Sequence, residues 1–214
     1  MSTTLVLGTK NPNVRLLECL TTMDEDDTKD SDYRCVVDGH HVKYVTTAPG
    51  IFCDEPEGDR NYGPTLLSRL LPTFPGGDWN QGRVAKDPST GDISFVTTEK
   101  VTFPSVKNVW HPLLLNELDF TEQEYLHPGV HIATHPDLNE GGPVVIKVAN
   151  WPWEVGSNEI ETTAYQWING HGIGPRFLGH VTEGKKGRVV ASPSNMCKVR
   201  DMRDPTTLRA ARKF

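Results

Sequence analysis

A lysine inside an apolar strand, followed by a glutamate on a helix, is the combination in this sequence best suited to chemistry. Lys147 stands within Val144-Val-Ile-Lys-Val-Ala149, whose β-branched residues predict a strand. A lysine there costs free energy unless its ammonium reaches water or a carboxylate. Glu161, on the inward face of the next predicted element, offers one. On these two residues alone, the alternative that Lys147 lies on an edge strand with a solvated ammonium stays open.

One predicted helix and several short strands must position this pair. Asn158 is predicted to cap the helix, because Glu161 follows it at the spacing of a capping box. Ala164, Tyr165 and Ile168 continue the face that begins at Glu161, and the glycines after residue 169 can end the helix. The strands expected around it are residues 125–126, 130–134, 144–149, 176–181 and 188–190.

Several phrases around these elements are distinctive as a series. They are Val144-Val-Ile-Lys-Val-Ala149, Trp151-Pro-Trp-Glu154, Glu161-Thr-Thr-Ala-Tyr-Gln-Trp-Ile168 and His171-Gly-Ile-Gly-Pro-Arg-Phe-Leu-Gly-His180, preceded by Leu71-Pro-Thr-Phe-Pro-Gly-Gly-Asp-Trp79 and Val109-Trp-His-Pro112. Together they resemble a fungal branch of the protein-kinase-like superfamily, over about residues 65–190. The resemblance implies the third strand, C-helix and fourth strand of a kinase N-lobe. It also implies that Lys147 pairs with nucleotide phosphates and that Glu161 is its helix partner.

Motifs that kinases need for phosphoryl transfer are missing. The turn His127-Pro-Gly-Val-His131 has one glycine and a proline where a glycine-rich loop would be expected. The nearest match to a catalytic loop is Val199-Arg-Asp-Met202, with Thr206 in place of the metal-binding asparagine. It lies only 54 residues after Lys147, and no Asp-Phe-Gly follows. The sequence therefore predicts no catalytic residue, and Asp201 is expected to be an exposed charge.

These absences favour a truncated kinase-like protein that contains the N-lobe only and lacks phosphotransferase activity. It would act as a binding or regulatory module for an unidentified protein partner. No cofactor is expected, although ATP is compatible with Lys147 and Glu161. Two alternatives stay open: an incomplete form of an active kinase or small-molecule phosphotransferase, and a glycosidase, because some relatives of this family carry an α-galactosidase label.

The predicted fold class is α+β. Residues 1–120 are expected to form an irregular leader of hairpins and short helices. Residues 121–190 are expected to form the kinase-like N-lobe, an antiparallel sheet of about five strands plus one C-helix. Residues 191–214 are expected to be a disordered or loosely docked tail. The leader elements predicted are a strand at 4–7, a helix at 14–20, a hairpin of 33–37 with 41–46, a helix at 66–71 and a hairpin of 83–86 with 93–97.

Charge and composition exclude several classes of function. The net charge of −6 combines +6 over residues 181–214 with −12 over residues 1–180. The basic segment lacks interleaved aromatic residues and the rest is acidic, so nucleic-acid binding is not favoured. No apolar run has the length of a membrane span, and no signal peptide is recognisable. Four cysteines without paired spacing favour free thiols in the cytoplasm or nucleus.

A histidine series also has the spacing of metal ligands. His127, His131 and His135 follow one another at four-residue intervals, which would bring them together on a helix. Pro128, Gly129 and the β-branched neighbours predict strands instead, and there such residues lie about 13 Å apart. No metal site is therefore predicted.

Overall fold

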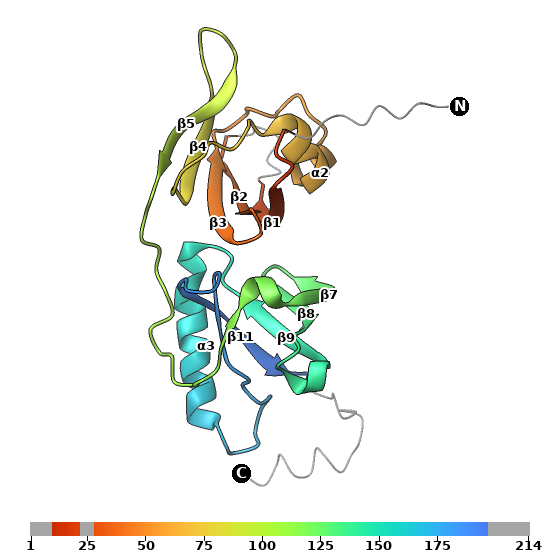
Figure 1. Ribbon diagram of the computed structural model, residues 1–214, viewed down its shortest axis with the longest axis vertical. Coiled ribbons are helices and arrows are strands. Elements are labelled where there is room, and N and C mark those ends of the chain that lie inside the picture. Colours follow the sequence, from red (N-terminus) through yellow and green to blue (C-terminus); the bar gives the residue numbers. More distant parts are fainter. Residues whose placement is uncertain (1–9, 22–27, 197–214) are drawn as a thin grey trace, which may run out of the picture. The chain divides into compact units, whose positions relative to one another are not determined.

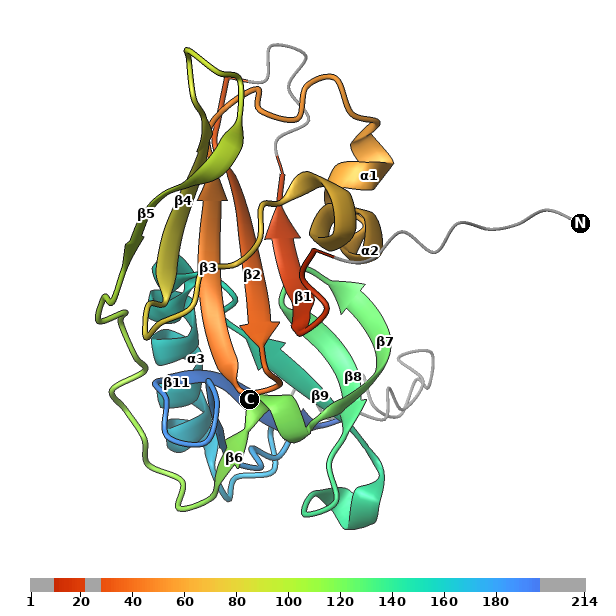
Figure 2. The same ribbon diagram turned by 45° about the horizontal axis from the view of Figure 1, so that its top comes forward.

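The chain folds into two compact units, each with its own β-sheet (Figure 1, Figure 2). The computed structural model describes residues 10–21 and 28–196. The first unit runs to Pro104 and includes Glu183–Gly187, and the second contains Ser105–Thr182 and the described residues from Arg188 onward. The fold class is α+β, as predicted. The division falls at residue 104 rather than at residue 120, because the two sheets gather separate hydrophobic cores.

Five strands form the sheet of the first unit, in the order β1-β2-β3-β4-β5. Neighbouring strands are antiparallel except β3 and β4, which are parallel. Both predicted hairpins are present, as β2–β3 and β4–β5. Figure 2 shows the strands side by side. Their bounds are β1 (Val14–Leu20), β2 (Ser31–Val37), β3 (His41–Thr47), β4 (Gln81–Lys86) and β5 (Ile93–Glu99).

The first strand corrects a sequence prediction. Residues 14–20 were predicted to be a helix, whereas they form β1 and pair with β2 from Val14 opposite Val37 to Leu20 opposite Asp32. The pairing joins residues far apart in the sequence, so local preference in 14–20 could not reveal it. The region is thus a sheet with a core, not an irregular leader. The strand predicted at residues 4–7 lies outside the described residues.

Short helices cover part of this sheet. They are α1 (Glu57–Asn61), α2 (Gly63–Thr65) and the π-helix η1 (Leu66–Leu70). The predicted helix at 66–71 is therefore confirmed, although as a π-helical turn that ends before Pro72. Leu66 and Leu71 are completely buried in the core of the first unit. Other buried members of this core are Val14, Tyr33, Cys35, Val37, Val45, Phe52, Leu67, Leu70, Trp79 and Val84.

Six strands form the sheet of the second unit, in the order β6-β10-β11-β9-β8-β7. Five of them are antiparallel to their neighbours, and β6 adds a parallel edge beside β10, so the sheet is mixed and has six strands where an antiparallel sheet of about five was predicted. The helix α3 (Val155–Ile168) lies beside β11 (Figure 1). The bounds are β6 (Leu114–Asn116), β7 (Thr121–His127), β8 (Val130–Thr134), β9 (Pro143–Val148), β10 (His180–Thr182) and β11 (Val189–Asn195). Three 3-10 turns join them: η2 (Glu117–Asp119), η3 (Asn139–Gly141) and η4 (Pro152–Glu154).

Two boundaries of the second unit differ from the predictions. The helix begins at Val155, directly after η4, and not at Asn158. Asn158 does not cap it, because its buried side chain donates to the Val190 carbonyl at 2.7 Å. The strand β11 continues to Asn195, so residues 191–195 belong to the sheet and not to the predicted tail. The rest of that tail, including Asp201, lies outside the described residues.

None of the helices in the described part of the chain combines the length and the apolar character that crossing a membrane requires.

Candidate functional site

The predicted lysine and glutamate meet in the second unit. Lys147 lies on β9, opposite Val130 of β8 on one side and Ser192 of β11 on the other. It is therefore on an interior strand, which excludes the edge-strand alternative. Its Nζ donates a hydrogen bond to Oε2 of Glu161. The side chains are 41% and 28% exposed, so both remain within reach of a ligand.

The rotation of α3 about its axis is what points Glu161 toward the sheet. Two polar residues of the helix are buried against their neighbours, Asn158 through its bond to Val190 and Thr162 at 1% exposure. The indole of Trp110 donates to the Thr162 carbonyl at 3.0 Å. Because these contacts fix Asn158 and Thr162, the residue before Thr162, which is Glu161, faces Lys147. On β9 the neighbouring Val144, Ile146 and Val148 alternate with the lysine and are buried in the core.

A cavity of about 340 Å³ lies at this pair. Its other polar lining comes from the end of β11, through Ser192, Ser194 and Asn195, from Tyr165 of α3 and from His127 at the end of β7. The Oδ1 atom of Asn195 is buried and has no hydrogen-bond partner among the described residues. The cavity thus combines an ammonium with several hydroxyl groups and a side-chain amide. Sequence reasoning missed the β11 residues, because only the pairing of β11 with β9 brings them to Lys147.

The turn between β7 and β8 consists of Pro128 and Gly129, and the residues on either side of it, His127 and Val130, line the same cavity. Gly129 has a φ of 73°, and its carbonyl accepts from the Val148 amide at 2.7 Å. A Cβ at this position would lie 2.6 Å from the Val148 oxygen, so only glycine fits. The turn is held against β9. It supplies no series of glycine amides, in agreement with the sequence.

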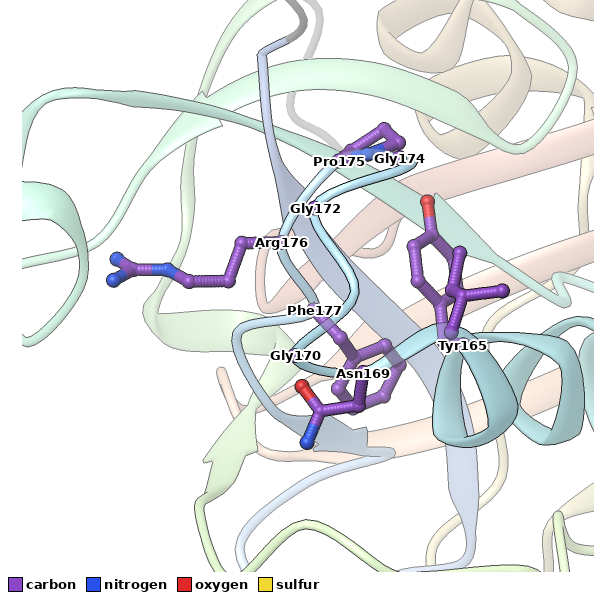
Figure 3. A pocket seen from close by; sticks show the side chains of 9 residues that line it. Tyr165, Asn169, Gly170, Gly172, Gly174, Pro175, Arg176 and Phe177 are labelled. Carbon is purple, nitrogen blue, oxygen red and sulfur yellow. The ribbon is translucent and has the colours of Figure 1, made fainter. Parts of the chain in front are cut away.

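A second cavity, of about 320 Å³, lies where α3 ends and shares Tyr165 and Pro175 with the first (Figure 3). Its lining is mainly glycine and apolar residues from the loop that follows the helix. Arg176 is the charged residue of this lining, and Figure 3 shows its side chain extending away from Tyr165. Phe177 closes the floor as a buried ring. This cavity therefore offers less for binding an anion than the one at Lys147.

Two of the distinctive sequence phrases pack against one another beside α3. The ring of Trp110 lies 4.8 Å from that of Phe177, and the ring of Phe177 lies 4.9 Å from that of His180. His180 is 1% exposed, and burial, together with the neighbouring His111, lowers its pKa from 6.5 to about 4. The His111 amide donates to Nε2 of His180 at 3.4 Å. His180 is thus a neutral packing residue.

The histidine series does not form a metal site. His131 Nδ1 lies 3.4 Å from Glu122 Oε2, and His135 Nδ1 accepts from the Asp137 amide at 3.1 Å. Within residues 10–21 and 28–196, no group of three or more His, Cys, Asp or Glu side chains could hold a metal ion.

Comparison of the chain with protein-family models, with curated proteins and with solved structures gave no match. The geometry of the second unit is therefore the basis for a functional assignment. It defines an α+β unit in which a strand lysine and a helix glutamate meet at a cavity.

Proposed function

We propose that the second unit is a kinase-like N-lobe that binds the phosphates of a nucleotide and serves as a binding module without transferring a phosphoryl group. The observation that carries this proposal is the contact between Lys147 and Glu161 at the cavity. The same pairing of a strand lysine with a helix glutamate positions nucleotide phosphates in protein kinases. The order of the elements supports the same assignment: the consecutive strands β7, β8 and β9, the last of which carries the lysine, precede the helix, and β10 and β11 follow it.

The energetics favour a positioning role for this pair. A partly exposed ion pair contributes about 0.2–1 kcal/mol to stability, so Lys147 and Glu161 add little to folding. A hydrogen bond from the ammonium to a phosphate oxygen would be worth about 1.5–3 kcal/mol. Glu161 holds the ammonium at the cavity, so little conformational freedom of Lys147 is lost when the phosphate binds.

Asn195 adds a side-chain amide to the lining, which can exchange hydrogen bonds with the polar groups of a base. The cavity volume of about 340 Å³ falls within the range of small-molecule sites. A nucleotide, which carries a base as well as phosphates, therefore fits the lining better than a free triphosphate does.

We propose binding without phosphoryl transfer because the sequence lacks motifs that transfer requires. Phosphoryl transfer depends on metal-held charge and on a positioned nucleophile. The β7–β8 turn has one glycine, and the sequence contains no Asp-Phe-Gly motif. The alternatives of an incomplete phosphotransferase and of a glycosidase gain no specific support from the described residues, and we do not propose them.

Nucleotide titration of the full chain tests this function. Isothermal titration with ATP, with and without Mg²⁺, is expected to show binding to the wild type. Lys147→Ala should weaken the affinity by roughly tenfold to a hundredfold, because it removes the charged donor. Lys107→Ala, at an exposed lysine of the same unit, is the matched control and should bind like the wild type. Asn195→Ala should weaken ATP but leave inorganic triphosphate unchanged.

Two outcomes of the titration would contradict the proposed function. If the wild type binds neither ATP nor triphosphate while its circular dichroism shows a folded chain, nucleotide binding is wrong. If Lys147→Ala and Lys107→Ala weaken ATP equally, binding occurs elsewhere on the surface. Either result would remove the proposed function.

A further inference from the structure

The outer surface of α3 is apolar where an exposed helix is normally charged. Ile160 and Trp167 are each 74% exposed and stand seven residues apart, so they lie on one side of the helix. Trp153, seven residues before Ile160 in the turn η4, is 62% exposed. We call Trp153, Ile160 and Trp167 the α3 stripe. It reverses the usual pattern, because the residues this helix buries include Asn158 and Thr162.

Among the described residues of its unit, the neighbours of α3 leave this stripe uncovered. One side of the helix faces the sheet through Asn158, which bonds to β11. The adjacent side is covered by the segment 105–110, since Asn108 Nδ2 donates to Thr163 Oγ1 at 3.0 Å and to Gln166 Oε1 at 2.9 Å. The remaining side holds the stripe. Three large apolar side chains exposed together in one row indicate an interaction surface.

One ring of the stripe is held in place by packing. The ring of Trp153 stacks on that of Trp151, with centroids 5.6 Å apart and planes inclined by 8°. Trp151 is itself buried, so it fixes the exposed ring. The helix fixes the backbone positions of Ile160 and Trp167. The part of the surface that is arranged in advance loses little conformational entropy when it binds.

No charged side chain lies within the stripe, and the carboxylates of this region are already engaged. Glu154 accepts from the Trp151 amide at 3.1 Å, and Glu159 accepts from the Lys107 amide at 2.6 Å. Glu161 is paired with Lys147. The three acidic residues beside the stripe are therefore held toward their own unit, and they would not repel an identical surface that approached.

The spacing of the large residues is symmetric about Ile160. Trp153 and Trp167 stand seven residues before and after it. In an antiparallel pair of helices related by a two-fold axis near Ile160, Ile160 therefore faces Ile160 of the second copy, and Trp153 of each copy faces Trp167 of the other. An isologous contact requires this kind of self-complementarity.

The area is sufficient for a weak dimer. A tryptophan side chain has a surface of up to about 250 Å². The three largely exposed side chains of the stripe therefore present about 450 Å² of apolar surface per copy, or about 900 Å² for two copies. A total of this size falls below about 1,200 Å², in the range of weak and transient interfaces. We propose that the α3 stripe is a homodimer interface, through which α3 of one chain packs antiparallel to α3 of a second copy.

Sedimentation velocity of the full chain at roughly 1–200 μM tests this proposal, because a contact of this size is expected to dissociate in the micromolar range. The wild type should shift from monomer to dimer as its concentration rises. Ile160→Glu should weaken the dimer at least tenfold, because it places a charge at the centre of the contact. Ile173→Glu is the matched control, since Ile173 is 73% exposed but lies on the loop after the helix.

A cross-link tests the two-fold arrangement independently. Ile160→Cys should give a disulfide-linked dimer on mild oxidation, with the bond mapped to residue 160 of both copies by mass spectrometry, whereas Ile173→Cys should not. A wild type that stays monomeric at the highest concentration would overturn the proposal. A dimer that Ile160→Glu and Ile173→Glu affect equally would overturn it as well.

Discussion

Acid should destabilise the second unit through His180, and the structure gives the size of the effect. This histidine is 1% exposed, and its pKa falls from 6.5 to about 4 because burial disfavours the imidazolium. Between these two values the unfolded chain binds a proton that the folded chain does not. Stability therefore decreases as the pH falls from 6.5 toward 4. The loss from His180 amounts to roughly 2 kcal/mol at pH 5 and roughly 3 kcal/mol at pH 4.

Urea unfolding at several pH values measures this loss. Four of the five tryptophans lie in the second unit, so their fluorescence follows its unfolding. The comparison is wild type against His180→Gln, which removes the titration but keeps an acceptor for the His111 amide. Between pH 7 and pH 5, the wild type should lose about 2 kcal/mol more than the variant.

The quantity to compare is the difference in free energy of unfolding between wild type and His180→Gln, because the contributions of other titrating groups cancel in it. A variant that is less stable at every pH is compatible with the reasoning, because only the change with pH is compared. His171→Gln, at an exposed histidine, serves as the control and should follow the wild type. Parallel curves for wild type and His180→Gln would refute the argument that burial of His180 controls acid stability.

Two further predictions concern packing and reactivity. Gly129→Ala should destabilise the second unit by roughly 1–3 kcal/mol, because its φ is left-handed and the new Cβ would meet the Val148 oxygen. Gly39→Ala has a similar φ but open space, so a smaller loss in urea unfolding is expected; equal losses would contradict the steric argument. Cys53 is exposed, whereas burial raises the pKa of Cys35 to about 12. Mass spectrometry should find iodoacetamide on Cys53 of the native chain and on Cys35 only after unfolding, and early labelling of Cys35 would count against its burial.

The sequence was most informative where local signals and neighbouring elements agree. The β2–β3 and β4–β5 hairpins follow from β-branched runs joined by turns, and both are present. The β-branched run around Lys147 likewise forms β9. Glu161 was placed on the inward face of the next helix, and the structure brings it to Lys147. The use of this pair for binding stays a prediction.

The failures share one physical cause, which is pairing between distant segments. Residues 14–20 form a strand because β2 is available beside them, although the strand carries no clear alternation of its own. The helix α3 begins before Asn158, because that side chain bonds to β11 instead of capping the helix. Residues 191–195 join the sheet through β9. None of these partners could be identified from the local sequence.

By itself, the sequence determined the fold class, the hairpins and the identity of the lysine and glutamate that meet. Short-range preferences and periodicity are enough for these, because they act within a few residues. Only the tertiary structure decided that Lys147 lies on an interior strand, that Asn195 lines its cavity and that α3 buries polar residues and exposes Trp167. Each of these depends on which surfaces meet, and burial is a property of the packed chain rather than of any segment within it.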